Sequence, residues 1–182
     1  MGKFENLPFA RGETYFAGDT NTATSTIGDK LLGQEYIVTD QTHGTNLPIR
    51  LRVVQNLSNA SILTGRGVTL STGASYGKSV TGYGGAQGAV GILPVDDAYT
   101  DTYSIINNDI FYVVVDGPVH VKAPTGTATT IVVGSKLTWG ATGHCEIAAD
   151  LDEAVLLSQG ASTPTQTNHD VLCIMGGLAG NF

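Results

Sequence analysis

Apolar and polar residues alternate along several short segments of the chain, which is the pattern of strands with one buried face. The clearest case is Pro48 to Val54, in which Ile49, Leu51 and Val53 alternate with two arginines. The run from Gln34 to Thr39 is rich in β-branched and aromatic residues, which also favours a strand. Both segments predict strands, and the alternation in Pro48 to Val54 predicts a core face and a solvated face.

The segment from Asp109 to Val115 is the most apolar part of the chain and predicts a central strand. Asp116-Gly117-Pro118 then predicts a bend, because glycine and proline are the residues that most often interrupt regular structure. From Val119 to Lys122, valines alternate with the polar residues His120 and Lys122. We therefore expect the central strand to continue beyond the bend.

Further short strands are expected where apolar runs are bounded by glycine, proline and small polar residues. Residues 150–158 fit either a short helix or a strand. Together these segments predict a mainly β fold, a small antiparallel β-barrel or sandwich with little helix. The additional strands are Gly67–Ser71, Lys78–Tyr83, Ala89–Val95, Thr129–Val133, Lys136–Trp139, His144–Ala148 and Asp170–Met175.

The first 32 residues show no hydrophobic period and are rich in glycine, threonine and asparagine. We expect an extended N-terminal arm over residues 1–32 and a single β-domain over residues 33–182. A polar arm cannot offset its own ordering entropy, so it is either mobile or held by a neighbouring chain. The apolar residues scattered along it favour the second alternative: Phe4, Leu7, Phe9, Tyr15 and Phe16.

Composition narrows the classes of partner. The 182 residues include 9 basic and 16 acidic side chains, which give a net charge of -7, so a phosphate backbone would be repelled and nucleic acid is not an expected partner. No stretch approaches the roughly 18 apolar residues that a membrane helix needs, and the N-terminus carries no export or lipid signal. Only 14% of residues are charged and 24 are glycine, which also favours short strands and turns over long helices.

The two cysteines, Cys145 and Cys173, match no redox or zinc spacing and are expected to be buried free thiols. His144 and His169 lie near them in sequence, and two imidazoles with two thiolates would suit zinc. Neighbouring residues on a strand point to opposite faces, however, which disfavours a metal shared by His144 and Cys145. No metal or cofactor is therefore assigned from the sequence.

Gly73-Ala74-Ser75-Tyr76-Gly77 matches the G-x-S-x-G motif that presents a nucleophilic serine in many hydrolases. That motif needs a helix directly after the serine, and the glycine-rich residues 78–88 do not favour one. Asp96, Asp97 and Asp101 could bind calcium through oxygen ligands, but their spacing is not that of an EF-hand, and a solvated acidic loop is expected. No catalytic residue is assigned, and an enzyme is not expected.

Tyrosines and the single tryptophan offer one more binding chemistry, because several exposed aromatic rings on one sheet could bind sugars. Tyr112 and Trp139 lie in apolar strand segments and are expected in the core. A carbohydrate-binding or receptor-binding face made by the remaining tyrosines stays an alternative.

The order of several segments resembles that of the capsid decoration, or cement, proteins of tailed bacteriophages. The resemblance covers the chain from about Gly33 onwards, and its most specific part is Asp109-Ile-Phe-Tyr-Val-Val-Val-Asp-Gly-Pro118. The segments that carry it are Arg50–Asn56, Ala60–Gly65, the Gly82-Tyr83 loop, Asn108–Val119, Gly134–Trp139 and Asn168–Leu172. Residues 150–167 and the arm depart from it.

This resemblance implies a β-barrel or β-tulip-like domain on the outer surface of a phage head, made in the host cytoplasm. It implies a structural virion protein that binds the major capsid protein, commonly as a homotrimer, and clamps neighbouring capsid subunits. The alternative within the virion is a carbohydrate- or receptor-binding accessory protein of the head or tail. No cofactor, nucleic acid or membrane is implied. The expected capsid-binding residues are Phe4, Leu7, Phe9, Arg11, Tyr15 and Phe16.

Overall fold

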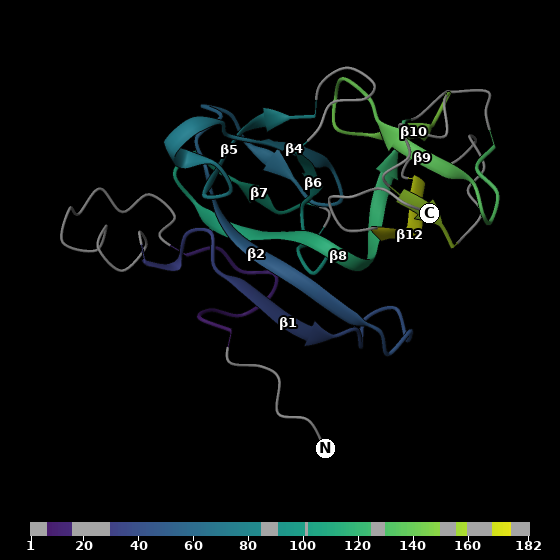
Figure 1. Cartoon of the computed structure of the whole chain (residues 1–182), viewed down its shortest axis with the longest axis horizontal. Helices are drawn as coiled ribbons and strands as arrows, with labels where there is room; N and C mark the ends of the chain where they lie inside the picture. The colour runs from purple at the N-terminus through teal and green to yellow at the C-terminus, as the bar shows by residue number, and fades with distance from the viewer. Residues whose placement is uncertain are drawn as a thin grey trace.

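Figure 1 shows the computed structural model of the protein. The structure describes residues 7–15, 30–84, 91–100, 102–124, 130–149, 156–159 and 169–175. Within these ranges the regular structure is almost entirely strand, with one short 3-10 helix at Gly73–Ser75. The strands are β1 (Glu35–Thr39), β2 (Pro48–Asn56), β3 (Ile62–Leu63), β4 (Gly67–Leu70), β5 (Ser79–Tyr83), β6 (Ile92–Pro94), β7 (Ser104–Ile105), β8 (Ile110–Ala123), β9 (Lys136–Trp139), β10 (Cys145–Ile147), β11 (Leu156–Ser158) and β12 (His169–Met175).

The long strand β8 joins two parts of one curled sheet (Figure 1). Its first half pairs with β2, with Gln55 opposite Ile110 and Arg50 opposite Asp116. Its second half pairs with β12, from Gly117 opposite Met175 to Ala123 opposite His169. The change of partner falls at the predicted bend, so the expectation of a central strand that continues beyond it is confirmed.

The remaining strands extend the sheet on both sides of β8. The order is β10-β9-β11-β12-β8-β2-β5-β4-β6, with β1 also paired to β2, while β3 and β7 form a separate two-stranded sheet. The pairing is antiparallel except between β2 and β5, where Gln55 lies opposite Ser79. A mainly β fold with a curled sheet confirms the predicted fold class at this level.

The core follows the hydrophobic pattern of the strands. On β2, Ile49, Leu51 and Val53 are fully buried, while Arg50 and Arg52 on the opposite face are partly exposed, as the alternation predicts. Most of β8 is buried on both faces, because the sheet curls and other segments pack across it. Tyr112 and Trp139 are both buried, which confirms their expected place in the core.

The glycine at the bend of β8 is required by its surroundings. Gly117 has a φ of +106°, which side-chain-bearing residues rarely adopt. A Cβ atom at this position would lie 2.4 Å from the carbonyl oxygen of Pro48. The close approach of β2 to the bend therefore depends on the absence of a side chain.

The extended arm is not found over the described part of the N-terminal segment. Residues 7–15 pack on the β-domain, and Tyr15 exchanges two backbone hydrogen bonds with Ile110, of 2.9 and 3.1 Å, at the start of β8. Tyr99 Oη donates a hydrogen bond to the carbonyl of Glu13 at 2.9 Å. The segment is therefore held in place by the β-domain of its own chain, whereas the sequence favoured a neighbouring chain.

Two local predictions also change. The expected strand Thr129–Val133 is not formed over its described residues: only Ile131 takes part in a β-bridge, and the chain then turns, with the amide of Ser135 donating to the carbonyl of Val132 at 3.0 Å. The ambiguous segment 150–158 contains a strand at its end, β11, because it pairs with both β9 and β12. Among the described residues, no helix is long and apolar enough to cross a bilayer.

Candidate functional site

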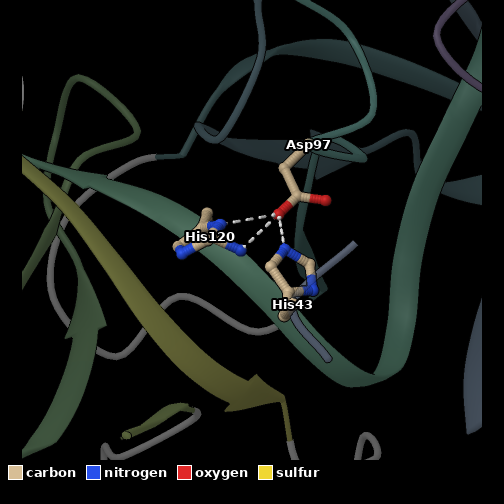
Figure 2. Close-up of side chains that lie close together, drawn as sticks. All are labelled: His43, Asp97 and His120. Carbon is tan, nitrogen blue, oxygen red and sulfur yellow. Dashed lines mark hydrogen bonds and ion pairs between the residues drawn. The ribbon is translucent and has the colours of Figure 1, made fainter. Parts of the chain in front are cut away.

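Three segments that are distant in the sequence meet beside the second half of β8. They are the turn after β1, the loop after β6, and β8 itself beyond its bend. Their side chains His43, Asp97 and His120 lie with one ligand-type atom each within 4.8 Å of the others. Figure 2 shows the two imidazole rings converging on one carboxylate.

The turn after β1 holds His43 in one orientation. The carboxylate of Asp40 accepts hydrogen bonds from the backbone amide of His43 at 3.0 Å and from that of Thr45 at 3.2 Å. It also accepts one from the Thr45 hydroxyl. Asp40 Oδ1 lies 2.9 Å from His43 Nδ1, and both side chains are fully buried. This local Asx-type turn leaves the other ring nitrogen, Nε2, facing the loop after β6.

Asp97 is the centre of the cluster. Its Oδ2 atom lies 2.6 Å from His43 Nε2 and 3.4 Å from His120 Nδ1, and it accepts a 2.7 Å hydrogen bond from the His120 backbone amide. The side chain of Asp97 is 7% exposed, whereas that of His120 is 40% exposed. The two imidazole rings meet edge to face, with centroids 4.4 Å apart. The cluster is therefore closed on the His43 side and open to solvent at His120.

The charges in the cluster stabilise one another. Hydrogen bonding to Asp97 is the main reason that the pKa of His43 is raised, against the opposing effect of burial. Burial alone would raise the pKa of Asp97, but hydrogen bonds from His120 and His43 hold it well below its ordinary value. A protonated His43 can donate to Asp40 and Asp97 at once, which satisfies both carboxylates.

Arg11 forms a second ion pair directly beside the cluster. Its guanidinium donates to both carboxylate oxygens of Asp96, at 2.9 and 2.5 Å, and lies 3.8 Å from Asp97 Oδ1. The Asp96 side chain is fully buried. Burial alone would lower the pKa of Arg11, but the hydrogen bond and charge of Asp96 outweigh it and raise the pKa. Asp96 depends on this cation, because a buried carboxylate without a partner is strongly unfavourable.

This arrangement corrects the expectation of a solvated acidic loop. The side chain of Asp96 is fully buried and that of Asp97 is 7% exposed, and each faces a cation or a histidine rather than water. Their neighbour Asp101 lies outside the described residues. Chemically, the group offers two imidazoles and one carboxylate, which can hold a proton or ligate a divalent metal ion.

Four of the six residues expected to bind a capsid lie on the chain's own β-domain. The ring of Phe9 stacks on Tyr112 with a centroid distance of 4.3 Å, and the Tyr112 hydroxyl donates to the Phe9 carbonyl at 2.8 Å. Tyr15 is also close to Phe9, at 5.8 Å between centroids. Leu7, Phe9, Ala10 and Arg11 line a surface pocket of about 380 Å³. Phe4 and Phe16 lie outside the described residues, and the capsid-binding role of all six stays a prediction.

The other sequence motifs fall in less reactive surroundings. Ser75 ends the short 3-10 helix, and strand β5 follows at Ser79, so the helix required after a nucleophilic serine is replaced by a strand. Cys145 and Cys173 are buried free thiols, as expected. Among the described tyrosines, only Tyr76 has a largely exposed side chain, which disfavours an aromatic sugar-binding face.

Sequence reasoning did not single out His43 or His120. The turn itself does carry a local signal, because Asp40, Gly44 and Asn46 are residue types that favour turns. His120 alternates with buried valines and is thereby marked as outward-facing. The three segments converge because of the topology that brings the loop after β6 beside β8. Local sequence patterns do not predict that topology.

Comparison with known proteins gives a distant likeness among solved structures. No family model matches the chain, and no curated protein matches it. Among solved structures, the chain is similar to the N base of the head fibre protein gp8.5 of bacteriophage phi29, with a TM-score of 0.47 and 15% sequence identity. The match covers 70% of this chain and 94% of that one. A likeness at this level assigns neither a family nor a function.

Proposed function

We propose that the protein is a capsid decoration protein of a tailed bacteriophage, which binds the outer surface of the head and clamps neighbouring major capsid subunits. The observation that carries the proposal is the position of its most specific sequence segment. Residues Asp109–Pro118, which resemble the decoration proteins most clearly, include the bend of β8 that joins the two parts of the sheet. The resemblance therefore lies in the strand that organises the domain, as expected for a shared β-tulip-like fold.

The proposal assigns the capsid contact to the N-terminal segment. Its described part is folded against β8 and lines a pocket, so the contact would be made by a preorganised surface rather than by a free arm. Preorganisation reduces the entropy lost on binding. Leu7, Phe9 and Arg11 would form this surface, and Phe4 and Phe16 would supply further apolar contacts.

The proposed role is mechanical and requires no catalysis. A trimer that engages several capsid subunits would bind far more tightly than one copy, since each later contact forms at high effective concentration. A protein with a net charge of -7 is repelled by the phosphates of packaged DNA, which suits a position on the outside of the head better than one on the inside.

The first test is quantitative mass spectrometry of gradient-purified particles of the phage that encodes the chain. We expect a molar ratio to the major capsid protein near one, or near a simple fraction such as one third. A few copies per particle would instead favour the alternative of a fibre or receptor-binding accessory. Absence from purified particles would overturn the virion assignment altogether.

A further inference from the structure

We propose that His43, Asp97 and His120 form a binding site for a transition-metal dication of the zinc type. The inference goes beyond the proposed capsid role and does not depend on it. Two imidazole nitrogens and a carboxylate oxygen lie within 4.8 Å of one another and come from three separate segments. This donor set is typical of sites that bind zinc through three protein ligands and leave one position open.

The first ligand is held in place before any ion binds. Asp40 Oδ1 lies 2.9 Å from His43 Nδ1, so the proton on Nδ1 is fixed and Nε2 is the atom directed at Asp97. A carboxylate behind a ligating histidine orients the ring and raises its basicity in many metal sites. Because Asp40 is itself held by the amides of His43 and Thr45, the orientation is built into the turn.

The other two ligands provide charge and access. Asp97 is nearly buried, and its Oδ1 atom has no hydrogen-bond partner. His120 is 40% exposed, so an ion can approach from solvent on its side. The guanidinium of Arg11 lies 3.8 Å from Asp97 Oδ1, but both of its hydrogen bonds go to Asp96. Asp40 and Asp97 together therefore remain available to balance a dication.

The geometry requires a small adjustment. Ligand atoms on a tetrahedral zinc ion with bonds of about 2.0 Å lie roughly 3.3 Å apart. His43 Nε2 and Asp97 Oδ2 are 2.6 Å apart because they share a proton in a hydrogen bond. The ion would replace that proton, which leaves to solvent, and the two atoms would separate by about 0.7 Å. His120 Nδ1 is already at the required separation from Asp97 Oδ2, at 3.4 Å.

Imidazole ligands identify the class of ion. Calcium and magnesium prefer sets made of oxygen atoms, whereas nitrogen ligands favour zinc and its neighbours in the first transition row. A bound ion would connect the turn after β1, the loop after β6 and the second half of β8. It would thus act as a cross-link among segments that are separated by 54 and 23 residues in sequence.

The test is titration of the full chain, without a polyhistidine tag, with Zn²⁺ by calorimetry and with thermal unfolding as a second readout. We expect one ion per chain. At a zinc concentration about 100 times Kd, the stabilisation predicts a rise in Tm of roughly 5–10 °C. Magnesium at the same concentration should leave Tm unchanged.

Matched histidine variants locate the ion. We expect His120→Ala to weaken zinc binding at least about 10-fold, since loss of a supporting group alone commonly costs that much. His144→Ala serves as the control, because its ring contacts Thr142 outside the cluster. Equal affinity in the wild type and the His120 variant, or no zinc binding by the wild type, would overturn the proposal.

A readout that needs no variant in the cluster covers the case in which His120→Ala fails to fold. Histidine side-chain NMR signals of the wild-type chain, with His144 assigned from its variant, should change on addition of one equivalent of zinc. Two imidazoles should respond together and His144 should not. If only His144 or His169 responds, the ion lies elsewhere and the assignment is wrong.

Discussion

At the residue scale, burial decides the chemistry of the two cysteines. Cys145, the first residue of β10, has no exposed surface, and burial raises its thiol pKa from 9.0 to about 12. Cys173 on β12 is similarly buried, and burial raises its pKa as well. A thiol that stays protonated is a poor nucleophile and a poor metal ligand, so these side chains serve packing.

The raised pKa of Cys145 predicts a loss of stability at high pH. Below pH 9 the thiol is protonated in both states and its contribution is fully present. Between pH 9 and about 12 the thiol ionises only in the unfolded chain, so the free energy of unfolding falls by about 1.4 kcal/mol per pH unit. Urea unfolding at pH 8, 9 and 10 measures this slope.

The variant Cys145→Ala is the control for that slope. It removes one thiol and should therefore show a shallower decrease above pH 9, although its overall stability is lower because of the cavity it creates. Identical slopes for the variant and the wild type would show that ionisation of Cys145 is not coupled to folding.

The sequence predicts the buried residues well and the buried charges poorly. Valines, leucines and isoleucines at alternate positions mark a core face because transfer from water favours their burial wherever the strand places them. A buried aspartate needs a particular partner, and for Asp96 that partner is Arg11, 85 residues earlier. The spacing of charged residues along the chain does not reveal a pairing between residues so far apart. The sequence therefore predicts that Asp96 and Asp97 lie in solvent.

At the scale of elements, β8 is the strand on which the sheet depends. Its two halves pair with different neighbours, and the change occurs at a glycine whose φ is positive. The sequence predicts this strand because its apolar run and its Gly-Pro interruption are both local signals. It does not predict which strands lie beside it, since pairing joins residues far apart along the chain.

Substitution of Gly117 tests the bend directly. Gly117→Ala combines an unfavourable φ with a contact of 2.4 Å to the Pro48 carbonyl, so it should destabilise the fold by more than about 2 kcal/mol. Gly134→Ala is the matched control, because Gly134 also has a positive φ but nothing lies within 4 Å of its added Cβ. We expect about 1 kcal/mol there. Equal losses, measured by urea unfolding, would rule out the close contact as a cause.

The turn after β1 shows the same limit of local patterns. Asp40 and Thr45 are bonded to each other within one short turn. The turn presents the Nε2 atom of His43. This atom becomes part of a site only because Asp97, 54 residues later in the sequence, lies beside it. The orientation of His43 therefore depends on local sequence, whereas its contact with Asp97 depends on the topology of the fold.

At the scale of the whole molecule, the N-terminal segment is part of the domain. Arg11 neutralises Asp96, Phe9 packs on Tyr112, and Tyr15 pairs with Ile110. Sparse apolar residues without a period cannot reveal such packing, because each finds its partner in a strand about 100 residues away. That is why the sequence predicted an arm where the structure has a docked segment.

Deletion of residues 2–15 should therefore destabilise the protein. Arg11→Ala leaves Asp96 without its cation, which should cost about 3–5 kcal/mol. The deletion should cost at least as much, because it also removes the stacking of Phe9 on Tyr112 and the pairing of Tyr15 with Ile110. Lys78→Ala, which removes an exposed cation, should change stability by less than about 0.5 kcal/mol. Urea unfolding of the three variants checks this.

A truncated chain as stable as the full one would show that the docked segment contributes nothing to the fold. The prediction also affects capsid-binding experiments, because a long N-terminal deletion would confound lost binding with lost stability. Phe4→Ala, which removes none of the described contacts, is the cleaner variant for that purpose.

The docking of residues 7–15 onto β8 has a consequence for synthesis on the ribosome. Phe9 emerges early, yet its partner Tyr112 follows 103 residues later. At roughly 5–20 residues per second, the segment waits about 5–20 s before that strand exists. During this interval its aromatic side chains are accessible to chaperones and to other nascent chains, so the order of translation, rather than equilibrium stability, sets the period in which this protein is most prone to aggregate.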